Sequence, residues 1–510
     1  MDPPCLINFP VELQTLILKS LLDISRGITA SQPTLQEHWD AGRSIYYGSD
    51  APVSSPRKAR LEQDLHATLL FPQNVAAVCQ LWRQIVVGIP EYWTRVVFDV
   101  AKDPTPFLNA FSWSIDLEKI EVFVFNSTSN AQDVDKDVEN ARVATIVHAL
   151  KAHIHRCRFI IFHLTYSSSL PSPFNFLANE APHLEDLTLD CRINDIELRG
   201  ETLDLRGAKV QGLPTSFPML RTLSLTGFWF IYMAYRSPSP WLESLKFAQH
   251  MSIKISQITL PKAGYFCLSN LLDRLTEMEA FTSIYFTDIS LDYLHDDSSP
   301  APTLGNFVYS LITNIHFDRV SRKFIEEFHA NTILEVNDHL SFKDCEVPYF
   351  TFGLGGDLLM LENIIDSDDG QNLRNVVGSW GGTELIIRSC SSFNDRFLSW
   401  LAGDVESPTH QTTDDSKDLT MLPAAGLMNL LISDCPNFSP RALQRLVEVR
   451  KGNNEFEGGL IWLTVNDSRD VLSEEDKQWF KENSGNMCIR WNAQHADGSE
   501  TSYFWGAGCG

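Results

Sequence analysis

The feature of this sequence that most constrains its fold is a short apolar pattern, L-x-x-L-x-L, that recurs along the chain. The fourth and sixth positions are apolar with one residue between them, which is the period of a strand that buries one face. A unit of this size cannot bury its apolar face alone, so the recurrence predicts units that stack on one another. Eight copies occur, at 184–189, 220–225, 242–247, 255–260, 281–286, 312–317, 427–432 and 460–465.

A turn and a helical segment follow several of these predicted strands. After the copy that ends at Ile432, Ser439 is a candidate N-cap and Pro440 takes the first helical position. Cys435 stands three residues after Ile432, and Cys390 stands three residues after another apolar strand residue. Each unit is therefore predicted to run strand, turn and helix.

These units resemble leucine-rich repeats, in which an Asn or Cys follows each strand. The resemblance implies an α/β fold, an irregular solenoid with one strand and one helix per repeat, over 184–472. It also implies that Cys390 and Cys435 are buried turn residues hydrogen-bonded to the backbone. Ligands of solenoids usually meet the strand-lined face, where outward candidates are Arg221, Lys246, His316 and Lys343.

Two departures from the repeat are visible. The acidic, Ser/Thr-rich stretch 403–420 is predicted to be an inserted loop. Residues 473–510 are predicted to form a C-terminal capping helix and a tail, with Ser473 and Asp476 in a capping-box-like arrangement. A terminal cap is what a solenoid needs to cover its last apolar face.

The N-terminal region has a different, helical pattern. In FPVELQTLILKSLL, Pro10 suits the first helical position, and Leu13, Ile17 and Leu21 recur at the spacing of one helix face. The stretch at about 23–64 is rich in Gly, Ser, Pro and mixed charge, and we expect it to be a disordered insertion.

A second helical pattern follows the insertion. Val75, Val78, Cys79, Trp82 and Val86 lie at the spacing of one helix face, which predicts a single helix that ends at the Gly88–Pro90 turn. Beyond this turn, Trp93 precedes RVVFDV, which is predicted to be the first strand.

In this order, the two helical segments resemble an F-box. The resemblance rests on Phe9-Pro10, the first apolar stripe, Val78-Cys79, Trp82-Arg83, Pro90 and Trp93. It departs from the family pattern in Phe9, which stands where Leu is usual, and in the long insertion. The resemblance implies an F-box-like helical domain over 1–98, joined to the repeats by a connecting region with the first irregular repeats at 99–183. It implies docking on a Skp-type adaptor, and through it on a cullin, by residues Pro10, Leu13, Ile17, Leu21, Val78, Trp82 and Trp93.

The function implied is that of the substrate-recognition subunit of an SCF-type ubiquitin ligase, whose repeats bind a protein substrate. The alternative is a leucine-rich-repeat scaffold with no link to a ubiquitin ligase, in which the first hundred residues only cap the array. The substrate itself is not indicated.

No motif predicts an enzyme, a cofactor or a metal site. GLGGD at 353–357 lacks the Lys-Ser/Thr of a phosphate loop, and GSWGG at 378–382 places its Ser at the wrong position for a nucleophile elbow. DSDDG at 366–370 resembles a calcium loop only locally. In HIHRCRF, His153, His155 and Cys157 alternate as on one strand face, but no second ligand pair follows at metal-site spacing.

Charge and hydropathy restrict the partners and the compartment. The formal net charge is −24 with no block of Lys and Arg, so nucleic acid would be repelled. No signal-peptide pattern and no apolar run of about 18 residues occurs, which predicts no membrane association. Ten cysteines are scattered singly, which favours a reducing compartment, the cytoplasm or the nucleus.

Overall fold

The computed structural model gives the fold of the chain in a series of described segments. They are residues 10–25, 72–115, 117–177, 181–196, 217–234, 245, 251–262, 266–278, 281–293, 307–309, 312–334, 338–350, 353–366, 370–404, 422–451, 459–467, 472–494 and 500–506.

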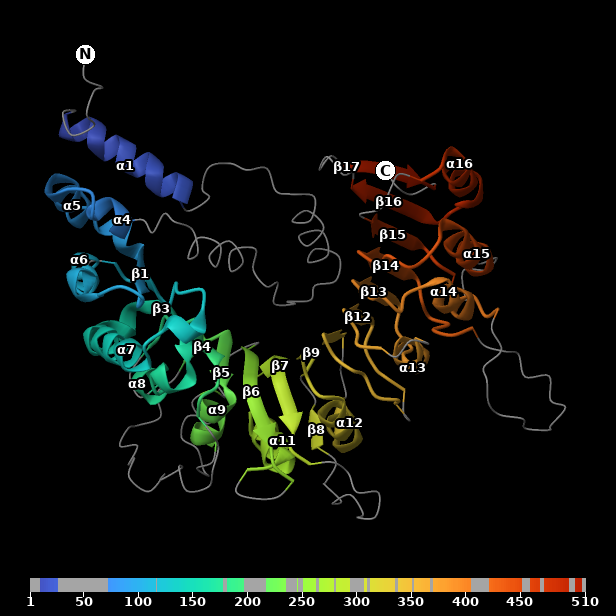
Figure 1. Cartoon of the computed structure of the whole chain (residues 1–510), viewed down its shortest axis with the longest axis horizontal. Coiled ribbons are helices and arrows are strands. Elements are labelled where there is room, and N and C mark those ends of the chain that lie inside the picture. Colours follow the sequence, from blue (N-terminus) through green and yellow to red (C-terminus); the bar gives the residue numbers. More distant parts are fainter. Residues whose placement is uncertain are drawn as a thin grey trace. The chain divides into compact units, whose positions relative to one another are not determined.

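Within these residues the protein is α/β, with thirteen α-helices and a parallel-rich sheet of fifteen strands (Figure 1). The chain divides into two compact units, which are described one at a time. The first comprises Met1–Gln257 with Glu277–Ser283, and the second comprises Ile258–Thr276 with Ile284–Gly510.

The first unit begins with helices and continues into parallel strands. The strands follow chain order in the sheet, and each pairs in parallel with the next. They are β1 (Arg95–Asp99), β2 (Ile120–Phe125), β3 (Cys157–Tyr166), β4 (Asp186–Ile193), β5 (Thr222–Thr226) and β6 (Met251–Leu260). The helices are α1 (Val11–Ser25), α4 (Gln73–Ala76), α5 (Gln80–Val87), α6 (Ala110–Trp113), α7 (Lys136–Leu150), α8 (Phe174–Leu177) and α9 (Gly227–Ala234), with the 3-10 turns η2 (Pro90–Thr94) and η5 (Lys151–Arg156).

One buried carboxylate ties α7 to the ends of the strands in the first unit. Glu139, 1% exposed, accepts hydrogen bonds from Asn126 Nδ2 at 2.9 Å and from the backbone N–H of Thr165 at 3.0 Å. These donors lie just beyond β2 and within β3, so a single side chain satisfies two neighbouring strand ends. A buried charge is stable only when it is hydrogen-bonded in this way.

The second unit repeats strand and helix more regularly. Its parallel strands are most of β7 (Phe281–Leu291), then β9 (Asn314–Asp318), β11 (His339–Lys343), β12 (Leu358–Glu362), β13 (Glu384–Arg388), β14 (Asn429–Ser433), β15 (Trp462–Asp467) and β16 (Cys488–Gln494). Strand β17 (Glu500–Trp505) pairs antiparallel with β16, and β8 (Phe307–Tyr309) pairs with β10 (Thr332–Leu334) in a separate small sheet. The helices are α11 (Leu268–Glu277), α12 (Arg322–Asn331), α13 (Gln371–Ser379), α14 (Asp395–Leu401), α15 (Pro440–Arg450) and α16 (Glu474–Asn483).

In-register pairing lines up the buried side chains of the second unit. The second and fourth residues of each strand pair with their counterparts on the next strand and face the core. Phe317 stacks on Phe342 with ring centroids 5.3 Å apart, and Phe286 stacks on Phe317 at 5.7 Å. The aligned core residues are Leu340, Phe342, Leu359, Leu361, Leu385, Ile387, Leu430, Ile432, Leu463 and Val465, each 0–1% exposed.

The residue after each of five strands of this unit adopts a positive φ. These residues are Arg319, Asp344, Asn363, Ser389 and Asp434, with φ between 48° and 53°. The N–H of each donates to a carbonyl at or next to the end of the following strand, as Asp344 does to Glu362 at 3.0 Å and Asp434 does to Asn466 at 3.0 Å. This left-handed conformation is costly for most residues and is best tolerated by Asn and Asp. A backbone hydrogen bond to the following strand accompanies this conformation at all five positions.

The cysteines expected in these turns are buried and hydrogen-bonded to the backbone. The Cys390 thiol donates to the carbonyl of Arg388 at 3.2 Å, and the Cys435 thiol donates to that of Ser433 at 3.4 Å. Cys345 is bonded in the same way to Lys343. Burial raises the pKa of the Cys390 thiol to about 11, so it is no nucleophile near neutral pH.

The strand register corrects one predicted repeat. The strand paired with LRTLSL is MSIKIS, because Leu223 pairs with Ile253 and Leu225 with Ile255. The predicted ISQITL copy therefore starts too late: the true strand places Ile253 and Ile255, not Ile258 and Leu260, beside the preceding leucines. Both alignments place apolar residues at the two core positions, so the sequence pattern alone does not distinguish them.

The C-terminal segment contains more than a capping helix and a tail. Helix α16 begins after Ser473, whose hydroxyl accepts from the Asp476 N–H at 3.1 Å. Beyond it, β16 and β17 extend the sheet, and Trp505 stacks on Phe480 of α16 at 5.5 Å. In β16, Ile489, Trp491 and Ala493 alternate with Arg490 and Asn492, which is a strand pattern, but the segment lacks the L-x-x-L-x-L spacing of the repeat.

Three predicted segments lie wholly or largely outside the described residues. They are the insertion at 23–64, apart from the last turn of α1; the LESLKF copy, of which Leu245 alone is described and buried; and the loop 403–420 beyond Asp404.

Helix α15 holds together the two ends of the acidic stretch. Arg450, 2% exposed, donates to the carbonyls of Leu401 at 3.0 Å and Ala424 at 2.9 Å, and also to that of Pro423. Burial without a carboxylate partner lowers the pKa of Arg450 to about 10. On the same helix, Arg445 forms an exposed two-bond ion pair with Asp404.

We predict that Arg450→Met destabilises the protein by about 3 kcal/mol, because it leaves several buried carbonyls without a donor. Arg445→Met is the matched control on the same helix. Its ion pair is exposed, so its removal should have little effect. Denaturant unfolding of both variants tests this, and equal losses for the two would contradict it.

A buried histidine gives the second unit an acid-sensitive step. His329 packs against the rings of Phe317, Phe328 and Phe350, and burial lowers its pKa to about 4. In the unfolded chain the pKa of this histidine is near 6.5. Between about pH 6.5 and 4, His329 is therefore protonated in the unfolded chain but not in the folded chain.

We predict that this group reduces the free energy of unfolding progressively as the pH falls from 6.5 to 4, and has no such effect above pH 7. Replacing it by His329→Phe should flatten the pH dependence of stability within that window. Identical slopes for the wild type and the variant would contradict the assignment.

Candidate functional site

The N-terminal helices are joined by a buried hydrogen bond between two side chains. Trp82 of α5 donates its indole N–H to Gln14 Oε1 of α1 at 2.7 Å. Trp82 is 8% exposed, Gln14 is 1% exposed, and the neighbouring Leu18 is fully buried. A buried indole needs an acceptor, and α1 supplies one from its inner face. Trp82 is therefore a core residue, which corrects the outward position expected for its side chain.

The second predicted helix is in fact two short helices. The chain between α4 and α5 is extended at Cys79, with φ −158° and ψ 167°, and its Sγ accepts from the Trp82 N–H at 3.4 Å. Cys79 thus serves as an N-cap of α5 instead of lying in mid-helix. The break turns Val78 outward, where it is 60% exposed.

Trp93 connects these helices to the strands from inside. It is fully buried, donates its indole N–H to the Val86 carbonyl at 3.0 Å and packs on Trp113 with ring centroids 4.6 Å apart. Gln73 of α4 also donates to the carbonyl of Val97, on the outer edge of β1. The N-terminal helices therefore cover an edge strand that would otherwise be open.

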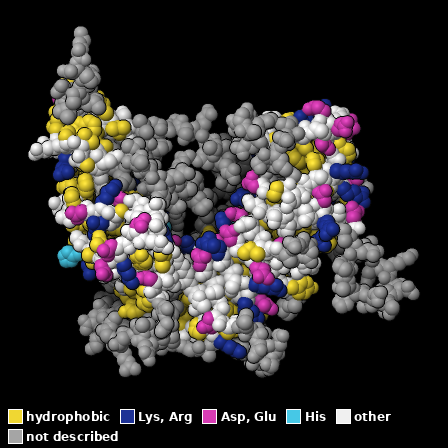
Figure 2. Space-filling model, in the orientation of Figure 1, with side chains coloured by type: hydrophobic (Ala, Val, Ile, Leu, Met, Phe, Trp, Pro, Cys, Tyr) yellow, Lys and Arg dark blue, Asp and Glu magenta, His cyan; other side chains and the backbone are white. Residues whose placement is uncertain are grey.

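The outer side of α1 carries exposed apolar residues. Leu13 is 48% and Leu16 is 58% exposed, and helical spacing places them on the side opposite Gln14 and Leu18. Ile17 and Leu21 are half-buried, while Pro10 is exposed. We call Leu13, Leu16 and Val78 the N-terminal apolar residues. Figure 2 shows hydrophobic side chains over the region of α1.

Of the seven residues predicted to contact an adaptor, the structure therefore exposes Pro10, Leu13 and Val78, half-buries Ile17 and Leu21, and buries Trp82 and Trp93. Leu16 lies beside the predicted apolar stripe and is more exposed than Leu13, Ile17 and Leu21. Gln14 is the residue in the sequence that indicates the buried side of α1, because a buried Trp requires a hydrogen-bond acceptor.

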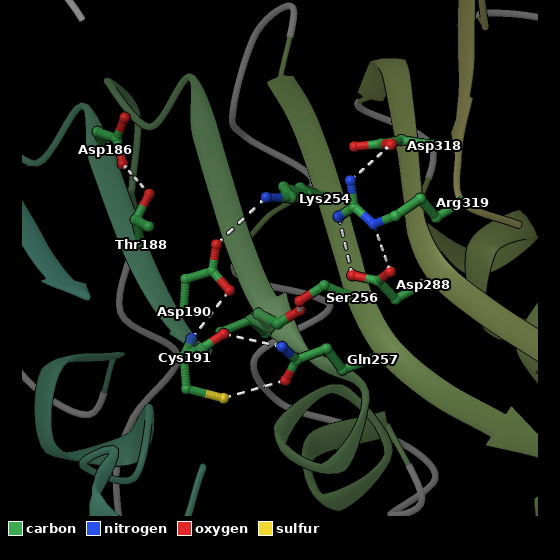
Figure 3. Close-up of polar contacts among 11 residues, drawn as sticks. Asp186, Thr188, Asp190, Cys191, Lys254, Ser256, Gln257, Asp288, Asp318 and Arg319 are labelled. Carbon is green, nitrogen blue, oxygen red and sulfur yellow. Dashed lines mark hydrogen bonds and ion pairs between the residues drawn. The ribbon is translucent and has the colours of Figure 1, made fainter. Parts of the chain in front are cut away.

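The second candidate surface is the outer face of the strands, opposite the core. In the first unit, Lys254 forms an ion pair with Asp190 at 3.2 Å, and Gln257 donates to the carbonyl of Cys191 at 2.8 Å (Figure 3). The Cys191 thiol donates to Gln257 Oε1 at 3.0 Å, but Cys191 is buried and lies on the core side of β4, in alternation with Leu187 and Leu189. These contacts bridge β4 and β6.

The outer face of the second unit has its own ion pairs. Arg319 donates to both oxygens of Asp288, at 2.6 and 3.0 Å, and to Asp318 at 2.9 Å, as Figure 3 shows. These carboxylates raise the pKa of Arg319. Lys343 pairs with Glu362 on the next strand at 2.5 Å.

The outward candidates of the sequence fall in different settings. Arg221 is exposed, Lys343 is paired, and Lys246 lies outside the described residues. The His316 ring stacks on Tyr285 at 4.2 Å, and burial keeps its pKa well below the usual value. These residues do not form one site.

The residues of HIHRCRF lie mainly in the 3-10 turn η5 and not on one strand face. His153 Nδ1 lies 3.3 Å from Arg156 Nη2, His155 is exposed, and Cys157 donates to the His153 carbonyl at 3.3 Å. Within the described segments, no group of three His, Cys, Asp or Glu side chains is placed to hold a metal ion.

Seven of the described cysteines are free thiols, whereas Cys488 of β16 is disulfide-bonded. Disulfides are rare in reducing compartments, so Cys488 departs from the expectation drawn from the scattered cysteines. In the described part of the chain, no helix combines the length and apolar character needed to cross a bilayer.

The sequence matches no protein-family model and no curated protein.

We predict that Gln14→Leu loosens α1 from α5 by about 1–3 kcal/mol, because the buried indole N–H of Trp82 loses its acceptor. Amide exchange of α1 residues should accelerate accordingly. Gln84→Leu, at an exposed position of α5, is the control and should leave exchange unchanged. Unaltered exchange in Gln14→Leu would contradict the role given to this bond.

Proposed function

We propose that the protein is the substrate-recognition subunit of an SCF-type ubiquitin ligase. Its N-terminal helices dock on a Skp-type adaptor, and the outer face of its strands receives a protein substrate. The observation that carries the proposal is the pair Leu13 and Leu16, about half exposed on a helix that is anchored by its opposite face. Activity in the cytoplasm or nucleus is part of the same proposal.

An anchored helix with an apolar outer side is suited to a protein partner. Two leucines and Val78 in water cost free energy that a partner recovers by burial. The anchor matters because Gln14 and Trp82 set the rotation of α1, so the outer residues are presented in one orientation. A preorganised surface loses little entropy on binding.

Within this proposal, the buried tryptophans have a structural role. Trp82 and Trp93 hold the helices to each other and to β1, and the exposed aliphatic residues make the contact. The resemblance to an F-box supplies the identity of the partner, and the geometry supplies only the surface.

One observation favours the alternative of a scaffold without a ligase link. The contact of Gln73 with the outer edge of β1 lets the N-terminal helices act as a cap for the array. In that case the N-terminal apolar residues would have no adaptor to contact.

We predict that Leu13→Glu/Leu16→Glu weakens binding to a Skp-type adaptor by about 30-fold or more, since buried anchors of such interfaces each contribute about 2 kcal/mol. Binding is measured by pull-down and calorimetry with the full chain. Unfolding should be unchanged, because both side chains are exposed.

Val138→Glu is the control, since Val138 is exposed on α7 of the same unit. Loss of binding in this control, or full binding by the double variant, would refute adaptor docking through α1. A wild-type chain that does not bind the adaptor at all would favour the scaffold.

A further inference from the structure

The outer face of β11–β14 combines an apolar row with an excess of carboxylates. Strand pairing sets Met360 beside Ile386 and Ile386 beside Leu431, on the face opposite the core. Met360 and Leu431 are half-buried, Ile386 between them is only 4% exposed, and Leu358 lies one outward position earlier on β12. At about 4.8 Å per strand, the row from Met360 to Leu431 is about 10 Å long.

Carboxylates frame this row at both ends of the strands. Asp338, Asp357 and Glu384 stand at or just before the strand starts, and Asp344, Glu362 and Asp434 stand at or just after the strand ends. The same strand segments contain two cations, Lys343 and Arg388. Lys343 is already neutralised by Glu362 at 2.5 Å. The frame therefore has four more carboxylates than cations.

The excess of negative charge affects the pKa of one framing carboxylate. Partial burial and the neighbouring Asp357 carboxylate raise the pKa of Asp338. Such repulsion is relieved when a cation enters between the two groups. Asp434 and Asp357 are both exposed, so their carboxylates are accessible from outside.

We propose that the outer face of β11–β14 binds an extended, basic protein segment with interspersed apolar side chains, and that such segments mark the substrates. Only the statement that such segments mark substrates rests on the proposed ligase function; the binding of the segment does not depend on it. An extended chain advances about 6.6–6.8 Å for every two residues, so the apolar row accommodates two side chains on one side of such a segment. Lysines or arginines beside them meet the framing carboxylates. Acidic segments and nucleic acid are repelled by the same charges.

The test uses the full chain and fluorescent twelve-residue peptides, followed by anisotropy. A peptide of alternating Lys and Val is the probe, with Glu/Val and Lys/Ser peptides for comparison. The Lys/Val peptide should bind, with an affinity that falls as salt rises, and the Glu/Val peptide should not. The Lys/Ser peptide should bind about tenfold more weakly, since it buries no apolar side chain.

Matched variants locate the binding. Asp357→Asn/Asp434→Asn removes two framing charges, and Asn tolerates the positive φ of position 434. It should weaken Lys/Val binding about three- to tenfold. Glu326→Gln/Glu475→Gln removes the same charge from exposed positions on α12 and α16 and should leave the affinity unchanged.

Equal weakening by both pairs of substitutions would overturn the inference, because it would show attraction to the net charge alone. Equal binding of the Lys/Val and Glu/Val peptides would overturn it too. Adaptor binding is measured separately. Peptide binding without adaptor binding would refute the ligase function and leave this surface standing. Adaptor binding without peptide binding would refute this surface and leave the function standing.

Discussion

Each of the strands β11 to β15 buries only two large side chains on its core face, so its stability depends on parallel pairing in register with its neighbours. The pairing aligns rows such as Phe286, Phe317 and Phe342, and a slip of one residue would turn every row to the wrong face. The turns maintain this register. After five of the strands a residue with positive φ donates to the next strand, and in three of these turns a buried cysteine, Cys345, Cys390 or Cys435, bonds to a turn carbonyl.

The same register explains what the other face of the sheet can do. Because the second and fourth residues of these strands face the core, their first, third and fifth residues form rows on the outer face. In the second unit these rows differ along the sheet. At β7 and β9 they hold the Arg319 ion pairs and the Tyr285–His316 stack, whereas at β12–β14 they hold the apolar row and its carboxylate frame. A repetitive core thus carries a non-repetitive surface.

How much could be predicted from sequence differs between these parts. The Cys390 and Cys435 turns were predictable, because a fixed offset from an apolar strand leaves one place for a buried thiol. The register of β6 was not, because Ile253/Ile255 and Ile258/Leu260 satisfy the same pattern and only pairing with β5 distinguishes them. Strand β16 alternates apolar and polar residues but lacks the spacing of the repeat, so the repeat pattern did not include it, and the contact of Arg490 with Phe504 of β17 is visible only in the structure.

The N-terminal helices show the same limit at the candidate adaptor site. Helical spacing identified the apolar residues of α1 but not which side faces inward. That choice is made by one polar pair, Gln14 with Trp82, since a buried indole donor must be satisfied. The pair changes the role expected of Trp82, which stabilises the unit from inside, whereas Leu13 and Leu16 on the far side of α1 are exposed.

Docking through α1 is tested most sharply by amide hydrogen exchange of the full chain with and without a Skp-type adaptor. We predict added protection in α1 and in the turn around Val78, with the outer face of β11–β14 unchanged. Protection confined to the strands, or none anywhere, would contradict docking through the exposed side of α1.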